Sequence, residues 1–164
     1  MLKEIIERAK KFSKELADQQ VFINQPWVLC NEVQQNNIYY FQEDQTLLVI
    51  EPSGNTVVGT WKLLKNIDAL MVTYENHNWT LNRRFIDECI LIFTKGDEHF
   101  LFYNQNKEEE VGKKLIEFEN YLERLIKKDD DMDQDSSPLI STVVALLIIT
   151  LAILILLYNL QKTV

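Results

Sequence analysis

One uninterrupted apolar run near the C-terminus constrains this chain more than any other feature. Residues 139–158, from Leu139 to Tyr158, read LISTVVALLIITLAILILLY and carry no charged side chain. As a helix this run rises about 1.5 Å per residue and so spans roughly the 30 Å hydrocarbon core of a bilayer. A buried helix is the alternative, but so small a chain could not surround a helix that is apolar on every face. We predict one transmembrane helix that places the chain in a lipid bilayer.

The flanking residues predict how this helix is oriented. The N-terminus, MLKEIIERAKKFSKEL, is charged throughout and has neither the apolar stretch nor the cleavage site of a signal peptide. Basic residues near the span favour the N-terminal side, with Arg124, Lys127 and Lys128 there against Lys162 beyond it. Because basic residues favour the cytoplasm, we expect a cytoplasmic N-terminal domain and a C-terminus on the far side. This layout resembles that of tail-anchored proteins.

An acidic segment separates the predicted domain from the span. Residues 129–138 contain five aspartates, which repel one another and bury little, so they predict a flexible linker. The domain boundaries follow as 1–128 for the soluble domain, 129–138 for the linker, 139–158 for the span and 159–164 for a short polar tail. The chain carries a net charge of −8, which disfavours binding to nucleic acid or to anionic headgroups.

The soluble domain reads as a run of strands between two helices. Apolar residues from Leu2 to Leu16 recur every three to four positions and predict an amphipathic helix. Short runs rich in aromatic and β-branched residues follow, separated by turn residues such as Pro52-Ser53-Gly54-Asn55. We predict eight strands, at Trp27–Asn31, Ile38–Gln42, Leu47–Glu51, Thr56–Leu64, Ala69–Glu75, Trp79–Ile86, Cys89–Thr94 and His99–Asn104.

A second helix is predicted at 107–128, where Val111, Leu115, Phe118, Leu122 and Leu125 form an apolar stripe. Glu117, Glu119 and Glu123 are expected on its solvated side. The fold class is therefore α+β: an antiparallel meander of about seven or eight strands, forming a closed or half-closed barrel, flanked by helices.

This order of elements resembles the pleckstrin-homology-like superfold, and Gly59-Thr60-Trp61 is similar to the glycine-x-tryptophan of lipocalin-like barrels. Lipid-binding members of the first group use basic residues between their first two strands. The corresponding segment here, 32–37, has no lysine or arginine, so the resemblance does not extend to phosphoinositide binding.

The sequence offers few residues for chemistry. His77 and His99 lack the neighbours of a zinc site, and no motif for a cofactor or a catalytic centre is present. Cys30 and Cys89 lie in apolar stretches without CxxC spacing, so we expect two reduced thiols. The pair Asp87-Glu88 lies between two predicted strands, and an exposed acidic turn is a better interpretation than an acid–base pair. We therefore expect a protein that is not an enzyme and needs no metal or cofactor.

Three residues are candidates for contact with a partner. Arg83 and Arg84 could recognise a carboxylate or phosphate, although alternation would turn only one of them toward a shared pocket. An ion pair with Asp87 or Glu88 is the structural alternative. Trp79 is the aromatic candidate. The leading hypothesis is a membrane-tethered module that binds a protein partner, and the alternative is a membrane-anchored small barrel that binds an apolar ligand or lipid.

Overall fold

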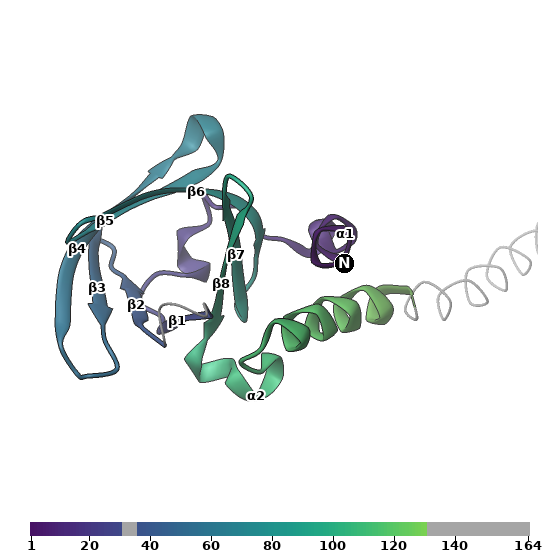
Figure 1. Ribbon diagram of the computed structural model, residues 1–164. Coiled ribbons are helices and arrows are strands. Elements are labelled where there is room, and N and C mark those ends of the chain that lie inside the picture. The colour runs from purple at the N-terminus through teal and green to yellow at the C-terminus, as the bar shows by residue number, and fades with distance from the viewer. Residues whose placement is uncertain (31–35, 131–164) are drawn as a thin grey trace, which may run out of the picture. The chain divides into compact units, whose positions relative to one another are not determined.

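Eight antiparallel strands form a closed barrel in the computed structural model (Figure 1). Each strand pairs with the next along the chain, and β8 pairs with β1 to close the sheet. Closure pairs the backbone groups that an open sheet would leave exposed at its two edges. The strands are β1 (Trp27–Cys30), β2 (Ile38–Phe41), β3 (Thr46–Ile50), β4 (Thr56–Leu64), β5 (Ala69–Tyr74), β6 (His77–Ile86), β7 (Ile90–Lys95) and β8 (Glu98–Asn104).

The structure describes residues 1–30 and 36–130. The chain divides into two units, Met1–Leu125 and Ile126–Val164, and the barrel belongs to the first. The predicted transmembrane helix at 139–158 lies outside the described residues, as do the tail and most of the predicted linker. Within the described part of the chain, no helix is both long enough and apolar enough to cross a membrane.

The structure confirms the predicted meander and selects the closed arrangement. Every predicted strand is present, with ends shifted by two residues or fewer. The largest shift is at the start of β6, which was predicted at Trp79 and lies at His77. Glu75 adopts a left-handed conformation with φ of 48° and starts the turn earlier, so that His77 and Asn78 already pair with β5.

Alternation along the strands fills the barrel interior with large side chains. On β4, Val57, Trp61 and Leu63 face the core, as their spacing predicts. Gly59 belongs to the same inward-facing set, and the backbone of β5 passes so closely that a Cβ atom there would lie 2.3 Å from the carbonyl oxygen of Thr73. Glycine at this position therefore allows two neighbouring strands to approach each other.

The N-terminal segment enters one end of the barrel after a short helix. The helix α1 spans Leu2–Ala9 and continues as a 3-10 turn, η1 (Lys10–Phe12). The backbone N–H of Lys14 then donates to the carbonyl oxygen of Ile86 at 2.7 Å, and Leu16 joins the barrel core. The observed helix is therefore shorter than the predicted one, because the later part of the apolar pattern packs in the barrel.

A 3-10 turn, η2 (Gln19–Val21), brings Phe22 against the ring of Phe41, with centroids 5.8 Å apart, and against Trp61 at 5.5 Å. The carbonyl oxygen of Phe22 also accepts a hydrogen bond of 2.7 Å from the indole Nε1 of Trp27. These contacts fix the segment before β1 inside one end of the barrel.

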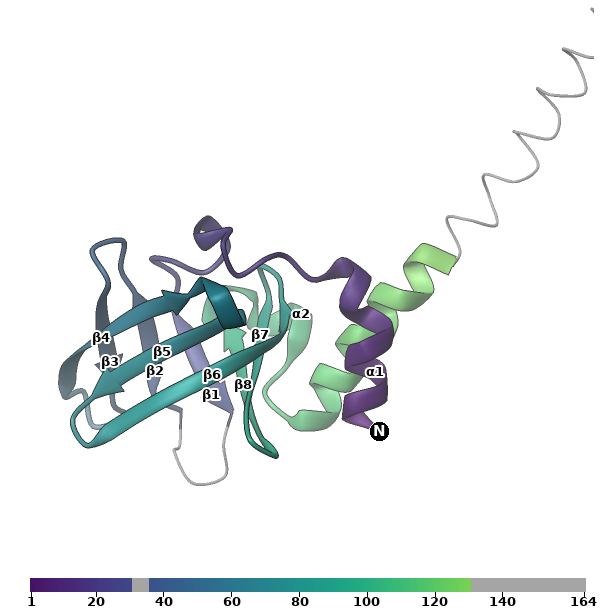
Figure 2. The ribbon, with the colours of Figure 1, turned by 90° about the horizontal axis from the view of Figure 1, so that it is seen from above.

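The chain's own helices cover one side of the barrel exterior. A register shift between Arg83 and Phe85 reverses the alternation on β6, so Phe85 faces outward with its partner Ile92 on β7. Phe85, Ile90 and Ile92 are nevertheless fully buried. The helix α1 contacts β6, and a helix beginning at residue 115 buries Phe118 and Leu122. Both helices lie on the side of the barrel that carries β7 and β8 (Figure 2).

The C-terminal helical region differs from the prediction in three respects. It is divided into a 3-10 turn, η4 (Gln105–Lys107), a short helix α2 (Glu108–Val111), and the helix from 115, because Gly112 has φ of 88° and breaks the run. Leu115 is 51% exposed and does not join the apolar stripe. Glu119, which was expected on the solvated side, is buried. The break at Gly112 rotates the following helix relative to a continuous one.

Candidate functional site

Arg83 is a structural link between three segments. Its Nε and Nη2 atoms lie 2.8 and 2.7 Å from the Oδ2 atom of Asp68, in the loop between β4 and β5. Its Nη1 atom donates to the carbonyl oxygen of Lys14 at 3.0 Å and to the Oγ atom of Ser13 at 3.2 Å. Arg83 therefore forms an ion pair with Asp68, and not with Asp87 or Glu88, the partners that we predicted. These bonds occupy the guanidinium, so Arg83 holds the N-terminal segment to the barrel.

Arg84 points elsewhere, as the alternation predicts. It is exposed, and its Nε atom donates to the Oγ1 atom of Thr94 at 3.0 Å. Arg83 lines a pocket of about 310 Å³ beside Leu63 and Asp68, whereas Arg84 lines a separate pocket of about 120 Å³ between α1 and the β7–β8 turn. The two arginines therefore do not form one anion-binding site.

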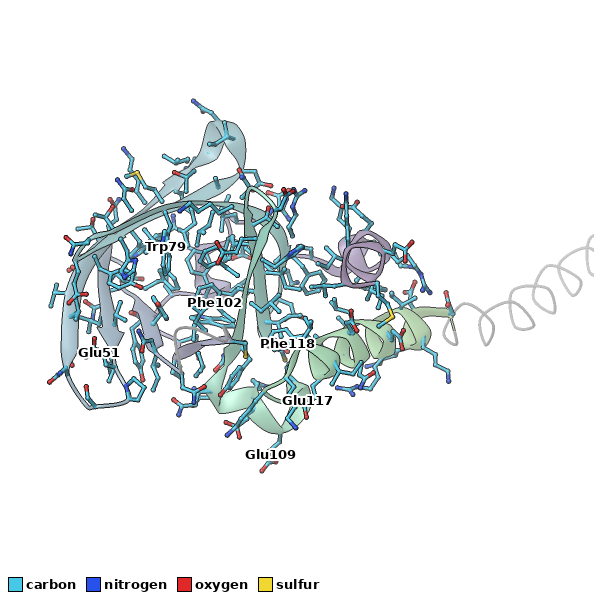
Figure 3. All side chains as sticks on the ribbon, viewed as in Figure 1. Glu51, Trp79, Phe102, Glu109, Glu117 and Phe118 are labelled. Atoms are coloured by element: carbon cyan, nitrogen blue, oxygen red, sulfur yellow. The ribbon has the colours of Figure 1, made fainter. Side chains whose placement is uncertain are left out.

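Trp79 lies inside the barrel, so the prediction that it contacts a partner is wrong. It is 7% exposed and pairs with Val72 on β5, which is also in the core. Its ring lies 5.5 Å from that of Tyr74 and 5.0 Å from that of Phe100. Figure 3 shows Trp79 and Phe102 directed into the barrel. Alternation on β6 turns this position inward, so Trp79 stabilises the fold rather than offering a surface.

Asp87 is buried, contrary to the exposed acidic turn that we predicted, whereas Glu88 is exposed. The carboxylate of Asp87 accepts hydrogen bonds of 2.8 Å from the backbone N–H groups of Cys89 and Ile90 and of 2.7 Å from the hydroxyl of Tyr121. Burial raises the pKa of Asp87, while the three donors oppose this change. The residue joins the β6–β7 turn to the helix from 115.

The two cysteines are free thiols in the structure. Burial raises the pKa of Cys89 to about 11 and that of Cys30 to about 12. Both side chains are therefore protonated near neutral pH, and a thiol is a much weaker nucleophile than a thiolate. Among residues 1–30 and 36–130, no group of three or more histidine, cysteine, aspartate or glutamate side chains could hold a metal ion.

The pKa of Asp87 gives a testable pH dependence. Because its pKa is higher in the folded than in the unfolded chain, its contribution is complete below the unfolded value and is lost as pH rises through the folded value. We expect the free energy of unfolding of the native chain, relative to an Asp87→Asn variant, to fall as pH rises above about 4. Urea unfolding of the detergent-solubilised chain at several pH values measures this difference. A rise with pH would show that the three hydrogen bonds outweigh burial.

The barrel interior is crossed by a polar contact between two tyrosines. The hydroxyl groups of Tyr39 on β2 and Tyr74 on β5 lie 2.9 Å apart in the buried interior. The ring of Tyr39 also lies 5.4 Å from that of Phe102 on β8. Burial raises the pKa of both tyrosines, so both hydroxyl groups are protonated and each can donate or accept. Rings from three well-separated strands therefore meet inside the barrel.

The outer surface of β2, β3 and β4 is apolar and lacks a covering helix among the described residues. Registers place Ile38 beside Ile50, Tyr40 beside Leu48, and Leu48 beside Val58. Val58 is 66% exposed, and the other four side chains are partly exposed. We name these five residues the β2–β4 face. In Figure 1, α1 and the helix from 115 lie beside β7 and β8, away from β3 and β4.

Sequence reasoning did not identify the β2–β4 face. In β2 and β3 the apolar residues occupy both inward and outward positions, so no alternation of apolar with polar residues distinguishes one side from the other. A strand that is apolar on both sides is usually covered on both sides. That pattern is the signal that could have indicated a contact surface here.

Comparison of the chain with protein-family models, with curated proteins and with solved structures finds no significant match.

Proposed function

We propose that this protein is a membrane-tethered, non-enzymatic interaction module that binds a protein partner through the β2–β4 face. The observation that carries the proposal is the contrast between the two sides of the barrel. Outward apolar residues of β6 and β7 are fully buried beneath the chain's helices, whereas Val58 is 66% exposed. Val58 and its partly exposed apolar neighbours form one continuous patch, and such patches commonly mark interaction sites.

The tether completes the proposal. The apolar run at 139–158 has the length and composition of a membrane span, and the acidic segment before it would separate the domain from the bilayer. The domain would then lie at the cytoplasmic surface, with its contact face free to meet a partner.

The alternative, a barrel that carries an apolar ligand or lipid, requires space inside the barrel. The described interior side chains instead contact one another from strand to strand, as in the pairs Tyr39–Tyr74 and Tyr39–Phe102. These contacts favour a barrel that acts as a scaffold for its outer surface.

A charge at Val58, the most exposed residue of the β2–β4 face, should remove the partner. We expect Val58→Asp to reduce the amount of co-purifying partner at least roughly tenfold, because an aspartate buried in an apolar interface loses its hydration without compensation. The measurement is isotope-labelled mass spectrometry of proteins that co-purify with the full chain after mild solubilisation. Ile67→Asp is the matched control, since Ile67 is 57% exposed but lies in the β4–β5 connection. Equal partner recovery in both variants would reject the β2–β4 face as the contact surface.

The proposed topology makes a separate prediction. In sealed, right-side-out cells, the domain should resist an external protease, because the cytoplasmic N-terminal side would be enclosed. Permeabilised cells provide the control, in which the same protease should digest the domain. Digestion in sealed cells would overturn the cytoplasmic assignment.

A further inference from the structure

We propose that the partner of the β2–β4 face has an apolar centre bordered by lysine or arginine side chains. This inference rests on the proposed function and specifies the chemistry of the partner. Its basis is the charge around the β2–β4 face, which is acidic at both ends and along one side.

Four carboxylates border the β2–β4 face. Glu43 and Asp44 are exposed in the β2–β3 turn at one end, and Glu51 begins the β3–β4 turn at the other. Glu75 is exposed and begins the β5–β6 turn directly after Tyr74, whose Cβ atom would lie 2.6 Å from a Cβ atom on Gly59, the neighbour of Val58. None of the four forms an ion pair with a described residue.

Basic residues are scarce on the same strands. Lys62 is the one lysine or arginine in β2, β3 and β4, and it lies near the end of β4, beyond Thr60. The backbone N–H of Thr46 donates to Asp44 at 2.9 Å and lowers the pKa of that carboxyl group, so its charge persists. The border of the face therefore has an excess of negative charge.

This charge distribution favours a basic partner over a second copy of the chain. Two copies docked through the β2–β4 face would bring their acidic borders close together, and like charges across an interface oppose association. A partner with lysine or arginine at its border would instead meet opposite charges while its apolar centre covered Val58 and Leu48. Long basic side chains can also lay their aliphatic portions over the edge of the apolar surface.

A photocrosslinker at Val58, the most exposed residue of the face, tests this inference. The full chain is expressed in cells with p-benzoylphenylalanine in place of Val58, and the yield and identity of adducts are measured after irradiation. The test variant reverses two border charges, Glu43→Lys with Glu75→Lys. The matched control makes the same change in charge elsewhere, with Glu98→Lys and Glu123→Lys, whose side chains are exposed away from the face.

The inference predicts that border reversal lowers the adduct yield at least roughly fivefold, that the control reversal does not, and that raising the salt concentration lowers the yield. It also predicts lysine or arginine near the crosslinked site of the adduct. An undiminished yield after border reversal would overturn the basic partner and leave the proposed function standing. An adduct with a second copy of the chain would also overturn it. Absence of any adduct from position 58 would reject the proposed function itself.

Discussion

Replacing Phe102 with alanine is expected to lower the free energy of unfolding by about 4 kcal/mol. Phe102 is 1% exposed, and its ring lies 5.4 Å from that of Tyr39 and 6.2 Å from that of Phe93. Removing it would leave a cavity bordered by rings that are held by different strands and cannot all move inward. The expected loss therefore includes both the transfer of the ring from the core and the cavity that remains.

Tryptophan fluorescence during urea unfolding measures this effect in the full, detergent-solubilised chain. The three tryptophans of the sequence, Trp27, Trp61 and Trp79, all lie in the barrel core, so their emission reports on the barrel. Leu115→Ala is the control and should change the free energy of unfolding by less than about 1 kcal/mol, because Leu115 is 51% exposed. A loss below about 1 kcal/mol for Phe102→Ala would contradict a tightly packed interior.

A methyl group at position 59 should destabilise the barrel by about 3 kcal/mol. In Gly59→Ala the new Cβ atom would lie 2.3 Å from the carbonyl oxygen of Thr73 and 2.6 Å from the Cβ atom of Tyr74. The first of these is a backbone atom in a paired strand, so relief would require β4 and β5 to separate. Separation would in turn weaken the hydrogen bonds between these strands.

The neighbouring position provides a matched control for Gly59→Ala. Thr60 is exposed on the outer surface of β4, and Thr60→Ala should cost less than about 1 kcal/mol, which reflects strand propensity alone. Both variants can be compared by the same fluorescence measurement. Equal stabilities would show that the close approach of β4 and β5 is unnecessary for the barrel.

The strands could be predicted from sequence because their signals are local. Turn residues such as Pro52 and Gly54 separate runs of aromatic and β-branched side chains, and each run is long enough for one strand. The division of apolar residues between interior and exterior could not be predicted for β2 and β3. Tyr39 and Tyr40 are adjacent and chemically identical, yet Tyr39 is buried in the barrel and Tyr40 lies on the outer face.

The helix ends depend on contacts that are distant in sequence. Leu16 continues the apolar spacing of α1, but the hydrogen bond between Lys14 and Ile86 draws its segment toward the barrel. Such a contact overrides a helical pattern because it joins residues far apart along the chain. Gly112 is a local signal for a helix break, but the apolar pattern on both sides of it led us to predict one continuous helix at 107–128.

Two of the three site corrections, those at Arg83 and Asp87, have the same origin. Asp68 directly precedes β5, and Arg83 lies on β6. These two strands pair as a hairpin in which Ala69 lies opposite Asn82, so Asp68 and Arg83 come together. Asp87 is buried because Tyr121 lies over its turn. Sequence spacing identified these residues as chemically capable but could not identify their partners.

Native mass spectrometry of the full chain, released from mild detergent after purification from its own cells, tests the central claim most directly. The account predicts a complex with a protein partner in the native chain and in Ile67→Asp, and the chain alone in Val58→Asp. It predicts no tightly bound small molecule, since Tyr39, Tyr74 and Phe102 meet inside the barrel. A stoichiometric small molecule retained by all three chains, without a protein partner, would contradict the account and make the barrel interior the functional site.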